Sequence, residues 1–363
     1  MVKSLILKGG RVKSLDLLRG FMAMCVVIYH IPQISRAVGL PHFSEWPMFN
    51  RGTEAVFVFF TLSGYLIIGL LYDEKEYFGS INIKNFYIRR ILRLYPVYYL
   101  VLTFGFVFYH FLLPLFGIPY ETNYNLIEAI VLNVAFLPNV FKTLYEPGSI
   151  LLVLWSIGIE EQFYLVIAPL LAVLALNRYI GGLVVFTLVY FIFSHTNYFT
   201  FLKEYSLYYY FMSAGGAFAV LNRNGYMLSF KSSFARLGVY LVFLFYFSTD
   251  WFQFHNETAK GAFELILFCV LIVNLVVDDK RFEKFRLMQY LGKISYGIYM
   301  YHMIVVNLVL FLFLKVHSLF HLSSTTVIIL INLSCIMGTI LVSHISFKYF
   351  ESKFLLLKYK FRD

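Results

Sequence analysis

Long apolar runs are the feature that most restricts what this 363-residue chain can fold into. An α-helix needs roughly 20 consecutive apolar residues to cross the hydrocarbon core of a bilayer. Hydrophobic residues make up 60% of the chain and charged residues only 14%, which excludes an ordinary soluble enzyme. The sequence therefore predicts an all-α, polytopic membrane protein. Its ten predicted helices, of which the fifth to the seventh are short for a full span, lie near residues 15–37, 53–72, 91–113, 151–176, 179–194, 206–221, 234–249, 261–277, 288–314 and 324–347.

The distribution of basic residues predicts how these helices are oriented. If the N-terminus is cytoplasmic, 23 of the 30 Lys and Arg residues fall on the cytoplasmic side and six on the outer side. Cytoplasmic loops of membrane proteins collect Lys and Arg, so both termini are expected in the cytoplasm. The same bias explains the net charge of +10 without a nucleic-acid partner. The expected division is a tail at 1–14, a transmembrane domain at 15–347 and a tail at 348–363.

One apolar run does not fit this scheme. Residues 126–137 are apolar over 12 positions and are bounded by Asn125 and Pro138. This length is too short for a span, so we predict an interfacial or re-entrant segment on the outer face rather than an eleventh helix.

Arg19 and His30 lie within the first predicted helix, where an ionisable side chain is costly and is a functional candidate by default. Arg19 and His30 are 11 residues apart, which is about three helical turns and about 16 Å of rise, so they share nearly the same face. We expect both to face one cavity. The alternative is structural: Arg19 extends to the membrane surface and His30 bonds a neighbouring carbonyl group.

Three arginines precede or enter the third predicted helix in the segment FYIRRILRLYP at residues 86–96. Arg89 and Arg93 are four residues apart and share a face, whereas Arg90 points about 100° away. Guanidinium groups suit bidentate phosphate binding. The alternative is that these charges only set the topology.

Two adjacent acids lie within the fourth predicted helix, in the segment WSIGIEEQFY at residues 155–164. Adjacent acids inside a span are difficult to explain by packing. Glu160 shares a face with Ser156, and Glu161 is rotated away, so the two acids are not expected to do the same job. His302, within the ninth predicted helix, is a weaker candidate because a lone histidine in a bundle is usually structural.

Together these motifs resemble the membrane-bound acyltransferase-3 family of bacterial O-acyltransferases. Five blocks occur in the order typical of the family, at residues 15–30, 54–67, 86–96, 155–164 and 291–302. The resemblance implies a ten-helix bundle that takes an acyl group, usually acetyl, from cytoplasmic acyl-CoA and passes it to a hydroxyl group at the outer face. It departs from the family at residues 351–353, which lack a frequent proline, and no hydrolase-like outer domain is expected.

The resemblance also implies roles for particular residues. Arg19 and His30 match the family's characteristic pair, and the three arginines match a motif associated with the phosphates of CoA. His30 is the expected general base for a sugar hydroxyl, or else carries the acyl group in a relay. Glu160 is expected to orient an imidazole or the acceptor. Supporting roles are expected for Ser63, Trp155, Glu161, Tyr296 and His302.

The combined prediction is an O-acetyltransferase of the bacterial inner membrane. Its donor is acetyl-CoA, and its acceptor is a surface polysaccharide or a lipid-linked glycan precursor. No metal is expected, because the three cysteines lie in apolar runs and form no CxxC pair. A transporter or flippase of a glycan intermediate is the alternative, since polar groups within spans suit both classes. Consumption of acetyl-CoA distinguishes the two.

Overall fold

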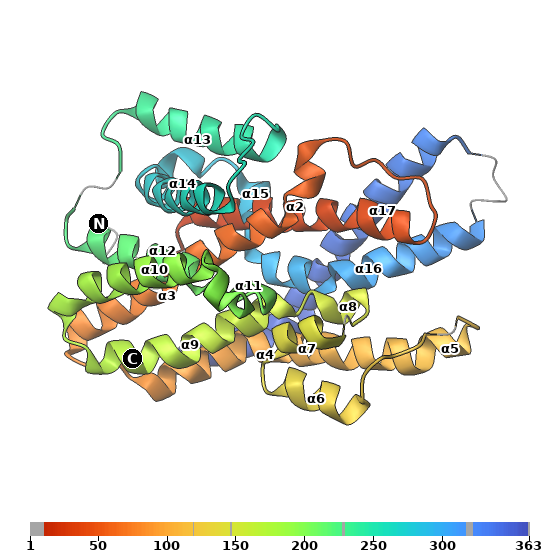
Figure 1. Ribbon diagram of the computed structural model, residues 1–363, viewed down its shortest axis with the longest axis horizontal. Coiled ribbons are helices and arrows are strands. Elements are labelled where there is room, and N and C mark those ends of the chain that lie inside the picture. The colour runs from red at the N-terminus through yellow and green to blue at the C-terminus, as the bar shows by residue number, and fades with distance from the viewer. Residues whose placement is uncertain (1–10, 119, 146, 227–228, 317–321, 362–363) are drawn as a thin grey trace.

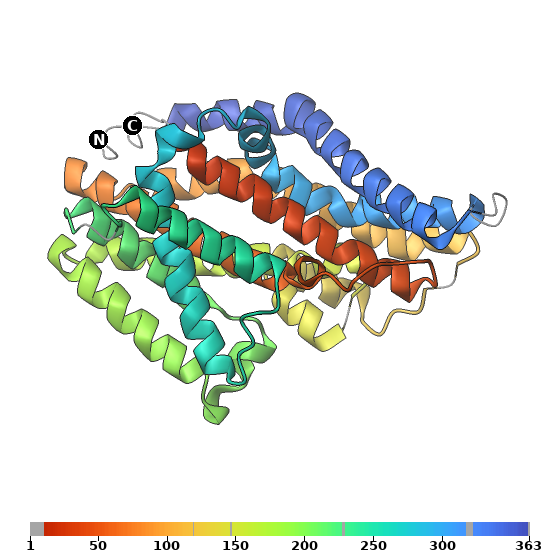
Figure 2. The ribbon, with the colours of Figure 1, turned by 90° about the horizontal axis from the view of Figure 1, so that it is seen from above.

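Every regular element is helical in the part of the chain that the computed structural model describes, which comprises residues 11–118, 120–145, 147–226, 229–316 and 322–361. The helices form a polytopic bundle (Figures 1 and 2). Within these residues eight helical segments are long and apolar enough to cross a membrane. Their main helices are α2 (Lys13–Ala37), α3 (Gly52–Phe78), α4 (Ile83–Val107), α9 (Trp155–Val173), α10 (Tyr179–Ser194), α14 (Glu257–Val277), α16 (Ser295–Val316) and α17 (Ser324–Ser346).

Several spans extend beyond their main helix. The α4 span continues through a π-helix and α5 (Leu113–Leu115), and α8 (Ser149–Leu152) precedes α9. The α17 span continues through a second π-helix into α18 (Ser352–Leu357). The two remaining predicted helices are the shorter α12 (Tyr209–Arg223) and α13 (Ser233–Ser248). All ten predicted helices are thus helical, and the all-α fold class is confirmed.

The core of the bundle is built around α3. Its most apolar stretch is 78% buried, compared with 17% for the α10 span and 22% for the α17 span, so the latter two face the lipid. Glycine allows α3 and α12 to cross closely: a Cβ atom on Gly64 would lie 1.8 Å from the carbonyl oxygen of Met212, and one on Gly215 would lie 2.0 Å from that of Thr61. Small residues commonly mark such close helix contacts in membrane proteins.

Two predicted helix boundaries are wrong. The ninth helix is broken into α15 (Arg286–Lys293) and α16, because Gly292 lies where α15 crosses α2 and a Cβ atom there would be 1.7 Å from the carbonyl oxygen of Asp16. The third helix starts at Ile83 rather than near residue 91, because the Asn82 side chain caps it by accepting a hydrogen bond from the Asn85 amide at 3.0 Å. This earlier start places the three arginines on a regular helix.

The short apolar run is also helical. Residues 126–137 form α6 (Leu126–Val134), capped by Asn125, which is followed by α7 (Pro138–Tyr145). α6 is far shorter than a span, in agreement with the prediction that this run is not an eleventh helix across the membrane. α6 and α7 lie beside the later part of α4 (Figure 1).

Both ends of the described chain lie at one end of the bundle. Arg11 and Lys358 line the same cavity, and the Arg89 side chain donates a hydrogen bond to the carbonyl oxygen of Phe361 at 2.8 Å. We call this the terminal end and the opposite one, which includes α7, the distal end. Arg19 lies nearer the terminal end of α2 and His30 nearer its distal end.

Candidate active site

A cavity of about 640 Å³ extends into the bundle from the terminal end. Its walls are formed by α2, α3, α4, α9 and α16, together with the helical segment after α17. The volume lies within the range of pockets that bind small molecules. The cavity therefore provides room for a ligand within the membrane-spanning part of the chain.

The three arginines of α4 all line this cavity. Arg89 forms an ion pair with Glu74 at 3.1 Å, and Arg90 lies over the Phe86 ring at 5.9 Å from its centroid. The Arg90 Nε atom is buried without a hydrogen-bond partner in the described part of the chain, and Arg93 forms no hydrogen bond or ion pair with any described residue. Arg90 lines the cavity together with the other two although it is rotated about 100° from them on the helix.

Arg19 and Glu160 line the same cavity deeper in the bundle. Ser63 donates a hydrogen bond to Glu160 Oε1 at 3.0 Å, and the Tyr164 hydroxyl donates to Oε2 at 3.1 Å. The Arg19 guanidinium lies 3.6 Å from the Asp16 carboxylate. The cavity thus contains a carboxylate fixed by two hydrogen bonds and a cation that has one long ion pair within the described part of the chain.

Glu161 has a different environment from Glu160. It is buried, it is absent from the described lining of the cavity, and its Oε1 atom has no hydrogen-bond partner among the described residues. Tyr296 does line the cavity, and its hydroxyl donates to the carbonyl oxygen of Leu94 at 2.6 Å. Adjacent residues on α9 point about 100° apart, so Glu160 lines the cavity and Glu161 does not belong to its described lining. This difference agrees with the prediction that the two acids do not do the same job.

Ser156 and Tyr299 line the cavity on α9 and α16. Their hydroxyl oxygens are 2.6 Å apart, and the Tyr299 hydroxyl also lies 2.9 Å from the carbonyl oxygen of Val153. The Tyr299 ring lies 6.4 Å from that of Phe59, another lining residue. Hydroxyl groups and aromatic rings thus form this part of the wall.

The two histidines lie behind Tyr299. The His30 and His302 ring centroids are 5.2 Å apart, and the His302 ring lies 5.8 Å from that of Tyr299. His302 Nδ1 is 2.5 Å from the Tyr299 carbonyl oxygen, which can only accept, so Nδ1 carries the proton in the neutral ring. The buried Nε2 atom then has a free lone pair, and it has no hydrogen-bond partner in the described residues.

This arrangement revises where His30 was expected. Arg19 lines the cavity, whereas His30 is not among its described lining residues. The His30 ring contacts that of His302, which in turn contacts the ring of the lining residue Tyr299. Trp155 is likewise absent from the described lining and packs edge-on against Phe60 with ring centroids 5.9 Å apart.

Glu351 is a site residue to which the sequence assigns no role, because the proline typical of its motif is missing. It is buried, lines the cavity from the π-helix after α17 and accepts a hydrogen bond from Ser346 at 3.0 Å. An acidic residue following a long apolar run was the signal that could have identified it. The missing proline does not remove the carboxylate from the wall.

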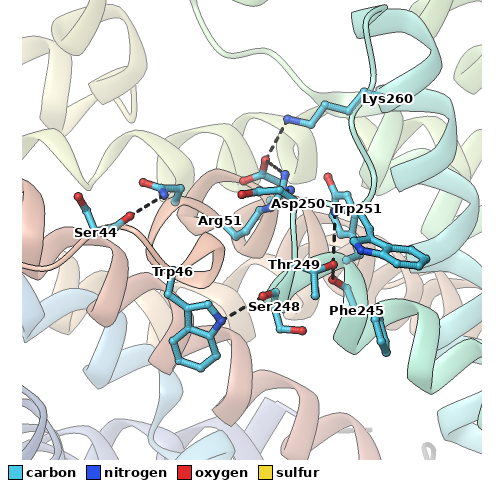
Figure 3. A network of polar contacts seen from close by, with 12 residues as sticks. Ser44, Trp46, Arg51, Phe245, Ser248, Thr249, Asp250, Trp251 and Lys260 are labelled. Atoms are coloured by element: carbon cyan, nitrogen blue, oxygen red, sulfur yellow. Dashed lines mark hydrogen bonds and ion pairs between the residues drawn. The ribbon is translucent and has the colours of Figure 1, made fainter.

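A second charged cluster, at the distal end, is closed by internal ion pairs (Figure 3). Glu54 accepts from Lys260 at 2.9 Å and from Arg51 at 3.3 Å, and Arg51 also lies 3.7 Å from Asp250. Lys260 additionally lies 3.8 Å from the buried Glu264. Charges that neutralise one another in this way fasten α3 to α14, and they leave the cavity as the candidate site.

Comparisons with known proteins agree on one activity. A family model described as an acyltransferase domain matches residues 12–345. The chain is 28% identical over 313 residues to a putative acetyltransferase, ORF330, of Acidianus two-tailed virus, covering 80% of this chain and 82% of the relative. It is 31% identical over 163 residues to the peptidoglycan O-acetyltransferase OatA of Listeria monocytogenes, covering 43% of this chain and 23% of the relative.

A third relative is the O-acetyltransferase OatA of Staphylococcus aureus, which is 35% identical over 176 residues. That match covers 46% of this chain and 25% of the relative, so the chain spans about a quarter of the length of either OatA. No solved structure matches.

Proposed function

This chain belongs to the membrane acyltransferase family whose model covers residues 12–345, and we propose that it transfers an acetyl group from cytoplasmic acetyl-CoA to a glycan hydroxyl. Membership makes the chain an acyltransferase, which favours an enzyme over the transporter that the sequence leaves open. The observation that carries the proposal is one cavity with arginines along α4 and a histidine pair directly behind its wall. The acceptor we propose is a surface polysaccharide or its lipid-linked precursor, supported by a relative named a peptidoglycan O-acetyltransferase.

Orientation follows from the basic residues and the shared position of the chain ends. We assign the terminal end to the cytoplasm, because 23 of the 30 Lys and Arg residues then lie on that side. The cavity would open where acetyl-CoA is available. The corresponding location is the bacterial inner membrane, with the distal end facing outward.

In this account Arg89, Arg90 and Arg93 bind the phosphate groups of the donor. Guanidinium groups form strong, often bidentate hydrogen bonds to phosphate. Arg93 is available for this purpose, since no described residue pairs with it. The pantetheine arm would then extend along the cavity and place the thioester near Arg19 and Tyr299.

His30 acts as the general base in the proposed reaction. It takes the proton of the acceptor hydroxyl, whose oxygen attacks the thioester carbonyl carbon. The carbon–sulfur bond breaks, and the departing thiolate takes a proton, so the products are the acetyl ester and free CoA. In the relay version His30 itself attacks the thioester carbonyl carbon first, and the same carbon–sulfur bond breaks. The acceptor hydroxyl then attacks the acetyl-imidazole, the carbon–nitrogen bond breaks, and the ester and the free His30 ring are formed. His302 holds the ring of His30 in place.

The hydroxyl groups of Ser63 and Tyr296, which line the cavity, already donate hydrogen bonds within the protein and are not free to stabilise an oxyanion. Ser63 donates to Glu160, and Tyr296 donates to the Leu94 carbonyl oxygen. We therefore assign the stabilisation of the oxyanion to the Arg19 guanidinium, whose one ion pair among the described residues is that with Asp16 at 3.6 Å. Glu160 would help to orient this cation from the opposite wall.

Replacement of His30 tests the chemical step. Acetyl-CoA consumption should fall at least about 100-fold in purified His30→Ala, because a general base contributes roughly 10²–10⁴-fold. His255→Ala is the matched control, since His255 is exposed in a distal loop, and its turnover should equal that of the wild type. Near-normal turnover of folded His30→Ala would remove His30 from the chemistry.

A further inference from the structure

Lys142, on α7 at the distal end, lacks a carboxylate partner in the part of the chain that the structure describes. Its ammonium nitrogen lies 4.6 Å from the centroid of the Trp155 ring. Its one described hydrogen bond, to Ser206 Oγ, is long at 3.4 Å. Arg51 and Lys260, in the distal charged cluster, differ because both pair with Glu54 (Figure 3).

This environment leaves the ammonium group incompletely satisfied. Lys142 is partly buried, and this burial lowers the pKa of its ammonium group. An ammonium group has three N–H donors, and one long hydrogen bond and an aromatic face use only part of that capacity. Two N–H donors of this partly buried cation therefore remain for an anionic ligand.

The partner of Lys142 is held in an unusual backbone conformation. Ser206 has φ +56°, in the left-handed region that non-glycine residues rarely adopt. The turn is fastened to α7 by two hydrogen bonds: Asn139 donates to the Tyr205 carbonyl oxygen at 2.9 Å, and Thr143 donates to that of Glu204 at 2.9 Å. These contacts keep the Ser206 hydroxyl beside Lys142 at a conformational cost, which is typical of functional positions.

The position of this group connects it to the candidate active site. Trp155 precedes Ser156, which lines the cavity, and its ring packs against Phe60, another lining residue. Lys142 therefore lies across Trp155 from the donor cavity. An acceptor that arrives from the distal side would meet this group.

We propose that Lys142, Trp155 and Ser206 form a binding subsite for an oxyanion, a carboxylate or phosphate group, carried by the acceptor. The ammonium and the hydroxyl bind the oxyanion, and the indole ring packs against the apolar face of the attached sugar. The acceptor is then an anionic glycan rather than a neutral one. This assignment of the oxyanion to the acceptor rests on the proposed function, whereas binding of the oxyanion does not.

Fluorescence of Trp155 reports binding without any acyl transfer. Of the three tryptophans, Trp46 and Trp251 would be replaced by phenylalanine, so that Trp155 is the only fluorophore. The purified protein in neutral detergent is titrated at constant ionic strength with sodium glucuronate, inorganic phosphate and glucose. We expect a saturable change in emission with glucuronate and with phosphate, and no change with glucose.

Substitutions assign the response to Lys142. Lys142→Met should weaken the response to glucuronate at least about 10-fold, since a hydrogen bond to a charged group contributes about 1.5–3 kcal/mol. Lys142→Arg should retain it, as should Lys203→Met, which removes an exposed distal lysine. The subsite would be overturned if the protein that retains Lys142 showed no change in emission with glucuronate. It would also be overturned if Lys142→Met showed an undiminished change.

Two lipid environments identify the source of the oxyanion. The same protein is placed in nanodiscs of phosphatidylcholine alone and of phosphatidylcholine with phosphatidylglycerol. Equal responses to glucuronate in both support an acceptor subsite. A change in emission caused by phosphatidylglycerol that glucuronate cannot reverse would show that Lys142 pairs with a lipid phosphate, and the acceptor assignment would be wrong. None of these titrations contains acetyl-CoA. A failure of the proposed acyl transfer would therefore appear in the assay of acetyl-CoA consumption and not in these binding measurements.

Discussion

Among single residues, the proposed chemistry depends most on His30 and His302, whose imidazole rings contact each other behind the cavity wall. His302 is fully buried, and its Nδ1 atom is held by the Tyr299 carbonyl oxygen. Nε2 is therefore the ring nitrogen that is left to accept a proton or a hydrogen bond, since it has no partner among the described residues. His30 is the described ring with which it forms its closest aromatic contact.

His302→Ala should lower kcat about 100-fold and leave the KM for acetyl-CoA within about twofold. Misplacement of a catalytic group by a distant support has effects of this size on the chemical step. The donor site is spared because His302 is absent from the described lining of the cavity. Steady-state kinetics that show KM rising in proportion to the fall in kcat would indicate general damage instead of a role for His302 in positioning His30.

Some residues of the candidate site are recognisable from the sequence, and others are not. Arg19 and Glu160 stand out because a charge within an apolar run needs a reason, and both line the cavity. The contact between His30 and His302 joins positions far apart in the chain, so no local pattern predicts it. Glu351 is not recognisable in the sequence because its surroundings lack the expected proline, yet it is buried and lines the cavity.

At the scale of elements, the crossing of α3 and α12 positions the cavity wall that carries Ser63. The backbones approach so closely at Gly64 that any side chain would meet the carbonyl group of Met212. Rigid backbone cannot move aside as a flexible side chain can. The cavity wall thus depends on a glycine that lies outside the described cavity lining.

Gly64→Ala should destabilise the protein by more than about 3 kcal/mol, since overpacking costs 1–3 kcal/mol where neighbours can adjust and these cannot. Thermal unfolding in detergent measures the effect. Gly238→Ala, on α13, is the matched control: nothing lies within 4 Å of its added Cβ atom, so stability should be unchanged or slightly higher. Equal melting temperatures for the two variants would contradict this packing.

Helix types are predictable from the sequence, whereas several boundaries are not. Apolar runs predict all ten helices because a span needs a minimum length. The break between α15 and α16 follows from backbone contact at Gly292 with α2, a tertiary constraint that hydropathy does not register. α4 begins at Ile83 because the Asn82 side chain caps it. A single asparagine among other polar residues does not by itself identify a helix start in the sequence.

For the molecule as a whole, we propose that the donor enters from the terminal end and the acceptor from the distal end. This division requires the terminal end to be cytoplasmic. The three native cysteines are buried, so an introduced cysteine can be labelled selectively. In intact cells a membrane-impermeant maleimide should label Lys203→Cys at the distal end and should not label Lys284→Cys at the terminal end, both being exposed positions. The reverse pattern would invert the topology and place the cavity mouth outside.

Binding of acetyl-CoA is the first measurement to make on this protein, because it examines the donor site without any knowledge of the acceptor. We would measure its affinity for the purified wild type and for Arg89→Ala/Arg93→Ala. The control, Lys280→Ala/Arg286→Ala, removes two exposed charges outside the described cavity lining. The account predicts wild-type binding that the arginine variant weakens at least about 100-fold and the control retains, since each charged hydrogen bond contributes about 1.5–3 kcal/mol. Absence of binding by folded wild type, or equal affinity in the arginine variant, would contradict it.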